Sequence, residues 1–399
     1  MSILDTILEN QKVEEVSKLD AIEIIDNLFG ELSERERDVL TRRYGLHSGI
    51  KETLESIGGA HELTRERIRQ IETTSIKKLQ QLKDLKTYLN TLRKVILQLL
   101  EEHGGLMEKE YLLNLLVGFS LNSFNTKTPD EQTHKNYLNF LITKLLFDEF
   151  EEINSSKHFL GSYKLKYKDL DHLEEITEEL LEKIKEAKET HSTETLISLM
   201  SDLESYKRHI DTIKAESTLD VAKFLKTDLF EEDSKTVNDN KVLYSILKAA
   251  KKIEQNKFGH WGVYNSREIK PKTINDKIYL ILKNYNKPMH FAEIADTINK
   301  ISFDGKTANA ATVHNELILD KKYVLVGRGL YGLREWGYKQ GTVTDVIKEV
   351  IIENGKAMTK EEIIKKVLEK RMVKKATIIL ALMNKDLFSK ENNKYSVIE

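Results

Sequence analysis

Residues 20–90 place apolar positions at the three- and four-residue spacing of amphipathic helices. The segment AIEIIDNLF (21–29) has this spacing and predicts a first helix. Ser33 then predicts the N-cap of a second helix, ERERDVLTRRYG, which Gly45 closes. The pattern indicates that this part of the chain is wholly helical.

The next two predicted helices are separated by only a short link. TLESIGGA predicts a short third helix that begins at Thr53 and ends at Gly58–Gly59. Thr64 is the expected N-cap of a fourth, longer and more basic helix that extends to about Leu85. A short helix, a tight link and a longer basic helix are typical of a helix-turn-helix.

The remainder of the chain repeats one pattern four times. In each copy an amphipathic helix runs into a short β-hairpin with alternating aromatic or aliphatic residues, and one or two further helices precede it. Three small helices followed by a hairpin is the winged-helix arrangement, and the irregular spacing indicates a string of domains and not a solenoid. The four helix-and-hairpin segments begin at Asn136, Lys241, Thr312 and Thr377.

These patterns predict a mainly α fold, in which a helix-turn-helix domain is followed by several winged-helix domains with small β-hairpin wings. At 399 residues the chain is too long for one hydrophobic core. The expected parts are a helix-turn-helix domain (1–88), a winged-helix-like domain (89–168), an acidic helical spacer (169–205), a second winged-helix-like domain (206–270), a further winged-helix domain (271–340) and a C-terminal winged-helix-like domain (341–399).

The amino-acid composition indicates the cellular compartment in which the protein is expected. The chain contains no cysteine, which removes disulfides, cysteine-based zinc sites and thiol catalysis and fits a reducing compartment. Its first twenty residues lack the basic and apolar regions of a signal peptide, and no apolar run approaches the roughly 20 residues of a membrane span. We therefore expect a cytoplasmic protein without a membrane partner.

Charge is distributed unevenly, although the net charge is only −2. From Thr64 to Tyr88 seven basic residues stand against three acidic ones, whereas from Asp169 to Glu204 twelve acidic residues stand against three basic ones. The first stretch suits phosphate and the second would be repelled by it. The acidic stretch is interpreted as a solvated spacer, with a surface for a basic protein partner as the alternative.

Helical spacing divides the fourth helix into two faces. Ile68, Ile71 and Leu79 face inward, while the opposite face carries Arg, Glu and Gln, which can pair with guanine, cytosine and adenine edges in a major groove. Flanking basic residues can neutralise phosphates. The alternative is a solvated helix with ordinary ion pairs. The candidate DNA-binding residues on this helix are Arg65, Glu66, Arg67, Arg69, Gln70, Thr73, Lys77 and Lys78.

The segments LSERERDVLTRRYGL and TLESIGGAHELTRERIRQIETTSIKKLQ closely resemble region 4 of the housekeeping bacterial sigma factors, over about residues 28–85. In that family the module reads the −35 promoter element and docks on the flap of the RNA polymerase β subunit. Nothing in the chain resembles the promoter-melting region of sigma factors, so we expect no promoter opening by this chain alone. The resemblance implies base reading by Arg65, Glu66 and Gln70, and polymerase or backbone contacts by Arg42, Arg43 and Arg67.

A second resemblance covers residues 275–338, which look like the HARE-HTH winged-helix family. It rests on the segments PMHFAEI, TVHNEL and VGRGLYGLREW. Members of that family are linked to DNA or polymerase binding. Arg328, between two glycines at the expected wing tip, is therefore a candidate DNA contact, with simple solvation as the alternative.

Other patterns that suggest sites have plainer explanations. Gly327-x-Gly329-x-x-Gly332 matches the dinucleotide fingerprint, but a strand follows it where that fold requires a helix. His290 and His314 lack the spacing of a metal site. We expect no catalytic residue, no metal, no cofactor and no small-molecule substrate, and hence no enzyme.

The sequence thus predicts a sigma-factor-like, DNA-binding transcription factor. Its expected partners are double-stranded DNA containing a −35-type element and bacterial RNA polymerase, contacted at the β flap. Two alternatives stay open: a DNA-binding specificity or modified-DNA sensing component of a defence system, and a scaffold whose winged helices bind only proteins. Salt-dependent DNA binding would separate the first two classes from the scaffold.

Overall fold

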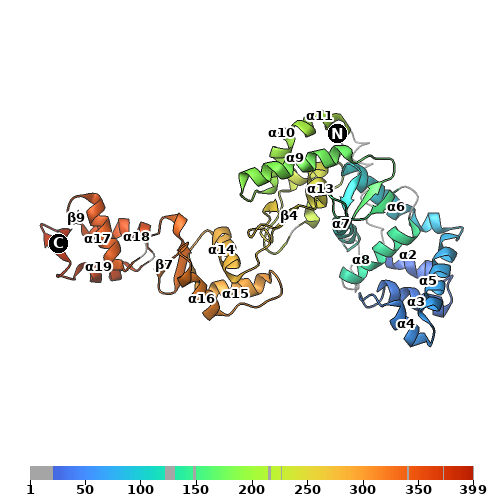
Figure 1. Cartoon of the computed structure of the whole chain (residues 1–399), viewed down its shortest axis with the longest axis horizontal. Helices are drawn as coiled ribbons and strands as arrows, with labels where there is room; N and C mark the ends of the chain where they lie inside the picture. Colours follow the sequence, from blue (N-terminus) through green and yellow to red (C-terminus); the bar gives the residue numbers. More distant parts are fainter. Residues whose placement is uncertain are drawn as a thin grey trace. The chain divides into compact units, whose positions relative to one another are not determined.

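The computed structural model describes residues 21–121, 131–146, 150–213, 217–225, 227–338, 341–371 and 373–398. The segment 1–20, on which the expectation of no signal peptide rests, lies outside these residues. Two compact units are present, unit 1 (Met1–Tyr264) and unit 2 (Asn265–Glu399), and each is described by itself (Figure 1). Among the described helices, none combines the length and apolar character that crossing a membrane requires.

Unit 1 is mainly helical and contains one three-stranded and one two-stranded antiparallel sheet. Its helices are α2 (Ala21–Phe29), α3 (Glu34–Tyr44), α4 (Leu54–His61), α5 (Arg65–Gln80), α6 (Leu85–Glu102), α7 (Lys109–Leu121), α8 (Glu131–Phe140), the π-helix η1 (Leu141–Leu145), α9 (Asp171–Ala187), α10 (Thr193–Asp202), α11 (Glu204–Ile213), the 3₁₀-helix η2 (Ala222–Phe224), α12 (Ser234–Asp239) and α13 (Lys241–Ala249). Its strands are β1 (Leu106–Glu108), β2 (Phe150–Ile153), β3 (Ser162–Leu165), β4 (Ile253–Gln255) and β5 (Trp261–Val263).

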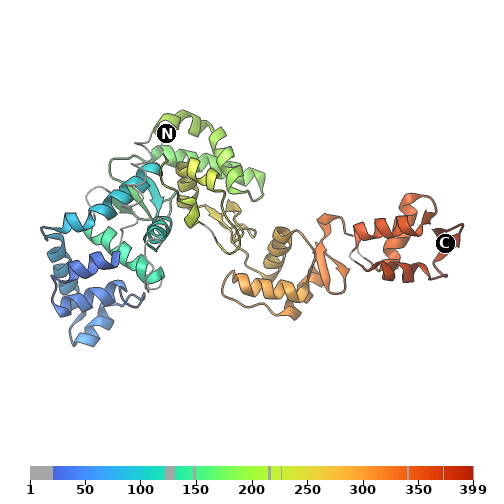
Figure 2. The same ribbon diagram turned by 180° about the vertical axis from the view of Figure 1, so that it is seen from behind.

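Unit 2 contains two successive helix-and-sheet parts. The first comprises α14 (Ile274–Tyr285), β6 (Met289–His290), α15 (Phe291–Ile301), α16 (Ala310–Leu319), β7 (Tyr323–Gly327), β8 (Leu330–Leu333) and η3 (Arg334–Trp336). The second comprises α17 (Val343–Asn354), β9 (Met358–Thr359), α18 (Lys360–Lys370), α19 (Lys375–Leu382), β10 (Phe388–Glu391) and β11 (Lys394–Val397), and Figure 2 gives the view from behind.

The four predicted N-terminal helices are present as α2 to α5, but two of their predicted ends are wrong. Helix α4 does not end at Gly58–Gly59, because Glu62 adopts the left-handed conformation that closes it after His61. Helix α5 ends at Gln80 and not near Leu85, since the chain turns there and starts α6.

One sheet topology occurs three times in the described chain. In each case a short strand that precedes the second helix pairs with the second strand of the hairpin, giving the orders β1-β3-β2, β6-β8-β7 and β9-β11-β10. The remaining predicted hairpin is the two-stranded pair β4–β5. All four predicted helix-and-hairpin segments are therefore present as small antiparallel sheets that follow helices.

A continuous hydrophobic core runs through unit 1 from α2 to β5. Phe140 of α8 is fully buried in it, and Trp261 of β5 is 1% exposed. The acidic stretch contributes as well, because Leu180 of α9 and Met200 of α10 are fully buried. Each such side chain contributes roughly 1.5–3 kcal/mol to folding relative to an exposed position, so the acidic helices bury one apolar face and expose their carboxylates on the other.

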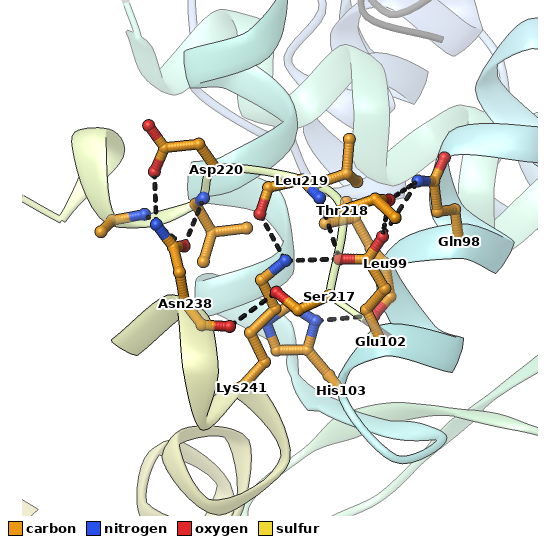
Figure 3. A network of polar contacts seen from close by, with 12 residues as sticks. Gln98, Leu99, Glu102, His103, Ser217, Thr218, Leu219, Asp220, Asn238 and Lys241 are labelled. Carbon is orange, nitrogen blue, oxygen red and sulfur yellow. Dashed lines mark hydrogen bonds and ion pairs between the residues drawn. The ribbon is translucent and has the colours of Figure 1, made fainter. Parts of the chain in front are cut away.

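A buried polar network joins α6 to α13 and to the segment between α11 and η2 (Figure 3). The Lys241 ammonium donates to the Glu102 carboxylate and to the Leu219 carbonyl, and the Thr218 hydroxyl donates to Glu102 at 2.5 Å. The Lys241 and Glu102 side chains are 1% and 6% exposed. A buried charge that loses its partner typically costs 3–5 kcal/mol, so this network fixes α13 against α6.

Candidate nucleic-acid interface

The link between α4 and α5 positions the helix that carries most candidate residues. Thr53 caps α4 by accepting a hydrogen bond from the Ser56 amide at 3.2 Å, and Thr64 caps α5 by accepting one from the Arg67 amide at 3.2 Å. Gly58 allows the link to fold back, because a Cβ there would lie 2.7 Å from the Leu63 carbonyl oxygen. The two helices are thereby held as a helix-turn-helix.

A small apolar cluster of its own holds the helix-turn-helix together. Val39 of α3, Ile57 of α4 and Ile68 of α5 are fully buried and contact one another, with Ile71 packed partly against them. Leu79, at the other end of α5, is fully buried in the larger core of unit 1. The inward face predicted for α5 is confirmed, and it leaves the opposite face to solvent.

All eight candidate residues on α5 are exposed. Arg65, Glu66 and Gln70, the expected base readers, lie on the first two turns of the helix. Within the described residues the Arg65 side chain forms no hydrogen bond. The helix therefore presents an arginine, a carboxylate and an amide to solvent at the end where recognition helices contact base edges.

Neighbouring side chains on this face already contact one another. The Arg69 guanidinium donates to both Glu66 carboxylate oxygens, at 2.9 Å and 2.6 Å, and these hydrogen bonds lower the pKa of Glu66. Arg67 donates to the Gln70 amide oxygen at 3.2 Å. These exposed contacts contribute little to stability, so the side chains can exchange them for contacts to a ligand.

The other predicted residues of α5 differ in how they are held. The Thr73 hydroxyl donates to the Arg69 carbonyl at 2.8 Å, so it is bonded to its own helix. Lys78 forms an exposed ion pair with Glu36 at 3.3 Å. The Lys77 side chain forms no hydrogen bond or ion pair within the described residues, which makes it the more readily available cation for a phosphate.

Arg42 and Arg43 lie at the end of α3 and are both engaged inside the module. Arg42 donates to Asp38 at 2.9 Å and also reaches Glu52. Arg43 donates to the Glu52 carbonyl at 3.1 Å and lies 3.5 Å from the Glu72 carboxylate of α5. Both side chains are half-buried, and together they tie α3 to the segment before α4 and to α5.

The ninth DNA-binding candidate, Arg328, belongs to unit 2. It is exposed at the turn between β7 and β8, beside Gly329, whose φ is +66°. A Cβ on Gly329 would lie 2.5 Å from His290 Nε2, so the turn requires glycine there. The turn holds Arg328 at a hairpin tip, in solvent.

The histidines near this hairpin have a packing role. His290 caps α15 by accepting a hydrogen bond from the Ala292 amide at 3.2 Å. Its ring packs against Phe291 in a tilted arrangement, and Phe291 packs in the same way against His314, with ring centroids 4.3 Å and 4.5 Å apart. In the part of the chain that the structure describes, no group of three or more His, Cys, Asp or Glu side chains is placed to hold a metal ion.

The support beneath the helix-turn-helix was not predicted from the sequence. Phe140 of α8 packs edge-on against Phe29 of α2 and Tyr44 of α3, with centroids 6.0 Å and 4.8 Å apart. Asn136 of α8 donates to the carbonyls of Gly45 and Gly49, at 3.1 Å and 2.9 Å. Helix α8 thus covers a face formed by α2, the end of α3 and the loop after it, and leaves the exposed face of α5 open.

Comparison with known proteins assigns this module to a class. Residues 28–81 match the family described as Sigma-70, region 4. The match covers α3 and the helix-turn-helix formed by α4 and α5, and it identifies a sigma-factor-like, DNA-binding segment.

Several bacterial sigma factors are similar in sequence to the chain over this segment. The RNA polymerase sigma factor SigA of Microcystis aeruginosa is 53% identical over 66 residues, which is 16% of this chain and 16% of that protein. SigA of Lactococcus lactis subsp. cremoris is 42% identical over 77 residues (19% and 21%), and RpoS of Coxiella burnetii is 32% identical over 87 residues (21% and 25%). The chain spans a quarter or less of the length of these relatives, and no solved structure matches it.

Proposed function

We propose that this chain is a transcription protein that recognises a −35-type promoter element through α5 and associates with RNA polymerase. The observation that carries the proposal is the joint exposure of Arg65, Glu66 and Gln70 on a helix-turn-helix of the sigma region 4 class. The relatives that share this segment are named as RNA polymerase sigma factors, which supports a role in transcription.

Base reading would proceed by exchange of contacts. In the free protein Glu66 is held by Arg69, and Gln70 by Arg67. In a major groove, Gln70 would pair with adenine, Arg65 with guanine and Glu66 with a cytosine amino group, while Arg67, Arg69 and Lys77 would turn to phosphates. A good bidentate pair contributes about 1–3 kcal/mol of discrimination between bases.

Contact with polymerase would use the same module, and we propose the flap of the β subunit as its partner. Arg42 and Arg43 would take part only after giving up internal ion pairs, so their contribution would be smaller than that of an exposed arginine.

In unit 2 we propose that residues 275–338 form a HARE-type winged helix, with Arg328 as a single phosphate contact. The strand order β6-β8-β7 and the exposed hairpin tip support that proposal.

Affinity capture from a native lysate tests the proposed function. The full chain carries a tag, and the lysate is treated with nuclease so that DNA cannot bridge two proteins. We expect the polymerase core subunits to co-elute, and we expect the purified chain to bind promoter duplex with a strong dependence on salt. Absence of polymerase together with DNA binding that has no sequence preference would refute the proposal.

A further inference from the structure

The three parts that share one sheet topology differ in the helix that precedes the hairpin. In unit 1 that helix, α8, is covered by α2 and α3. In the first part of unit 2 it is α16, and the segment from Asn309 to Asp320 contains neither lysine nor arginine. Its exposed end carries Ile318 and Leu319, which are 61% and 78% exposed. Neither helix offers a cationic surface.

The corresponding helix of the last part, α19, has the opposite character. Lys374 and Lys375 lie exposed at its start, and Lys385 lies exposed just beyond its end. No acidic residue occurs between positions 370 and 385. Ile378 and Leu382 are buried on the inner face of α19, whereas the three lysines are exposed at its two ends.

The hairpin that follows α19 extends the positive charge. Lys390 is exposed on β10, 5.6 Å from the centre of the Tyr395 ring. Lys394 of β11 is exposed on the opposite face of the hairpin, across from Glu391. The link between α19 and β10 has five residues, 383–387, and can span at most about 18 Å. The eight residues of α19 add about 12 Å, so the start of the helix and the hairpin lie within the roughly 34 Å rise of one DNA turn, and one duplex can reach both.

Four of these cations have no ion-pair partner in the described part of the chain, namely Lys374, Lys375, Lys385 and Lys390. Lys394 differs, because it lies opposite Glu391 in the hairpin and its charge lowers the pKa of Glu362. The only acidic residues from 374 to 398 are Asp386 and Glu391. Two nearby cations behave differently: Lys370 is paired with Glu353, and Arg371 donates to the Gly341 carbonyl. The charge of Lys374, Lys375, Lys385 and Lys390 is therefore available to attract an external polyanion.

We propose that the α19 surface, defined by Lys374, Lys375, Lys385 and Lys390, is a second contact site for duplex DNA that binds phosphates without reading sequence. This goes beyond the proposed function, in which α5 alone contacts DNA in unit 1 and Arg328 adds one phosphate contact. Duplex DNA carries one charge per about 1.7 Å of its axis, and it can meet cations on both a helix and a hairpin. The exposed Leu380 and Met383 between them can lie against the deoxyribose rings of the DNA backbone.

Salt-dependent binding of the full chain to random-sequence duplex tests the site. The double variant Lys374→Ala/Lys375→Ala removes two phosphate contacts, so the slope of log K against log salt should fall in magnitude by roughly 1.8 units. The matched control is Lys300→Ala/Lys365→Ala, which removes two exposed lysines of α15 and α18. Equal helicity and thermal unfolding of the two double variants exclude misfolding as the cause.

The result of this test can be distinguished from failure of the proposed function, in which α5 reads the bases. We expect Lys374→Ala/Lys375→Ala to weaken binding on every sequence and to leave the preferred site in a randomised library unchanged, because α5 is intact. A slope equal to that of the control variant would overturn the proposal. If Lys374→Ala/Lys375→Ala keeps the wild-type salt slope on DNA but loses binding to polyglutamate, the surface binds an acidic protein. That result would overturn the proposal as well.

Discussion

At the scale of single residues, arginines of the same module serve different purposes. Arg42 and Arg43 join α3 to Glu52 and Glu72, whereas Arg65 lies exposed at the start of α5. The sequence analysis gave all three arginines as candidate contact residues. Residue type alone does not reveal internal partners such as Glu52 and Glu72, which lie further along the chain. Exposure on the outer face of α5, by contrast, follows from helical spacing alone and could be predicted.

His103, at the end of α6, is a buried histidine whose ring is neutral near pH 7. Its Nδ1 donates to the Leu99 carbonyl at 2.7 Å, so the neutral ring accepts a hydrogen bond from the Tyr111 hydroxyl at Nε2, at 3.0 Å. Burial lowers its pKa to about 4. The folded protein therefore binds this proton less readily than the unfolded chain does.

This difference in the pKa of His103 between the folded and the unfolded chain predicts that acid lowers the stability of the fold. The stabilisation is fully present above pH 6.5, the ordinary pKa, and is lost as the pH falls from there towards 4. Between pH 7.5 and pH 5, His103 should remove about 2 kcal/mol from the free energy of unfolding. Urea denaturation at the two pH values measures this, and His103→Gln should reduce the pH dependence whereas His47→Gln, at an exposed histidine, should not.

At the scale of elements, the helix-turn-helix is the part that the sequence predicts best. The caps at Ser33, Thr53 and Thr64 are all observed, because each depends on residues within a few positions. The contact of α8 with this module was not predicted, since Asn136 bonds to Gly45 across 91 positions. Local periodicity carries no information about such a contact, and the sequence placed Asn136 at the start of a separate repeat.

Removing the Asn136 amide tests the importance of that contact. Asn136→Ala leaves the buried carbonyl of Gly45 and the carbonyl of Gly49 without their donor. We expect the free energy of unfolding to fall by about 1–3 kcal/mol and the amides of the loop after α3 to exchange faster with solvent. Asn315→Ala, at an exposed position of α16, is the control and should change stability by less than about 0.5 kcal/mol; an equal effect of both variants would contradict a supporting role for α8.

At the scale of the whole molecule, the charges of the chain nearly cancel, with a net charge of −2. Attraction to DNA must then come from local surfaces, such as the outer face of α5 in unit 1 and the α19 surface in unit 2. The first combines amide, carboxylate and guanidinium groups that can distinguish bases, and the second carries only ammonium groups among its charged contacts. We therefore expect sequence preference to depend on unit 1 alone, whereas phosphate contacts in both units contribute sequence-independent affinity.

Selection from a randomised duplex library at fixed salt tests the central claim that α5 reads bases. Gln70→Ala should cost about 1–3 kcal/mol on the preferred site and little on random DNA, and should relax the preference at the base pair that Gln70 contacts. Lys77→Ala, the matched control on the same helix, should weaken binding to preferred and random DNA alike, because phosphate contacts carry no sequence information. A selected sequence that stays unchanged in the Gln70→Ala variant would contradict base reading by this helix.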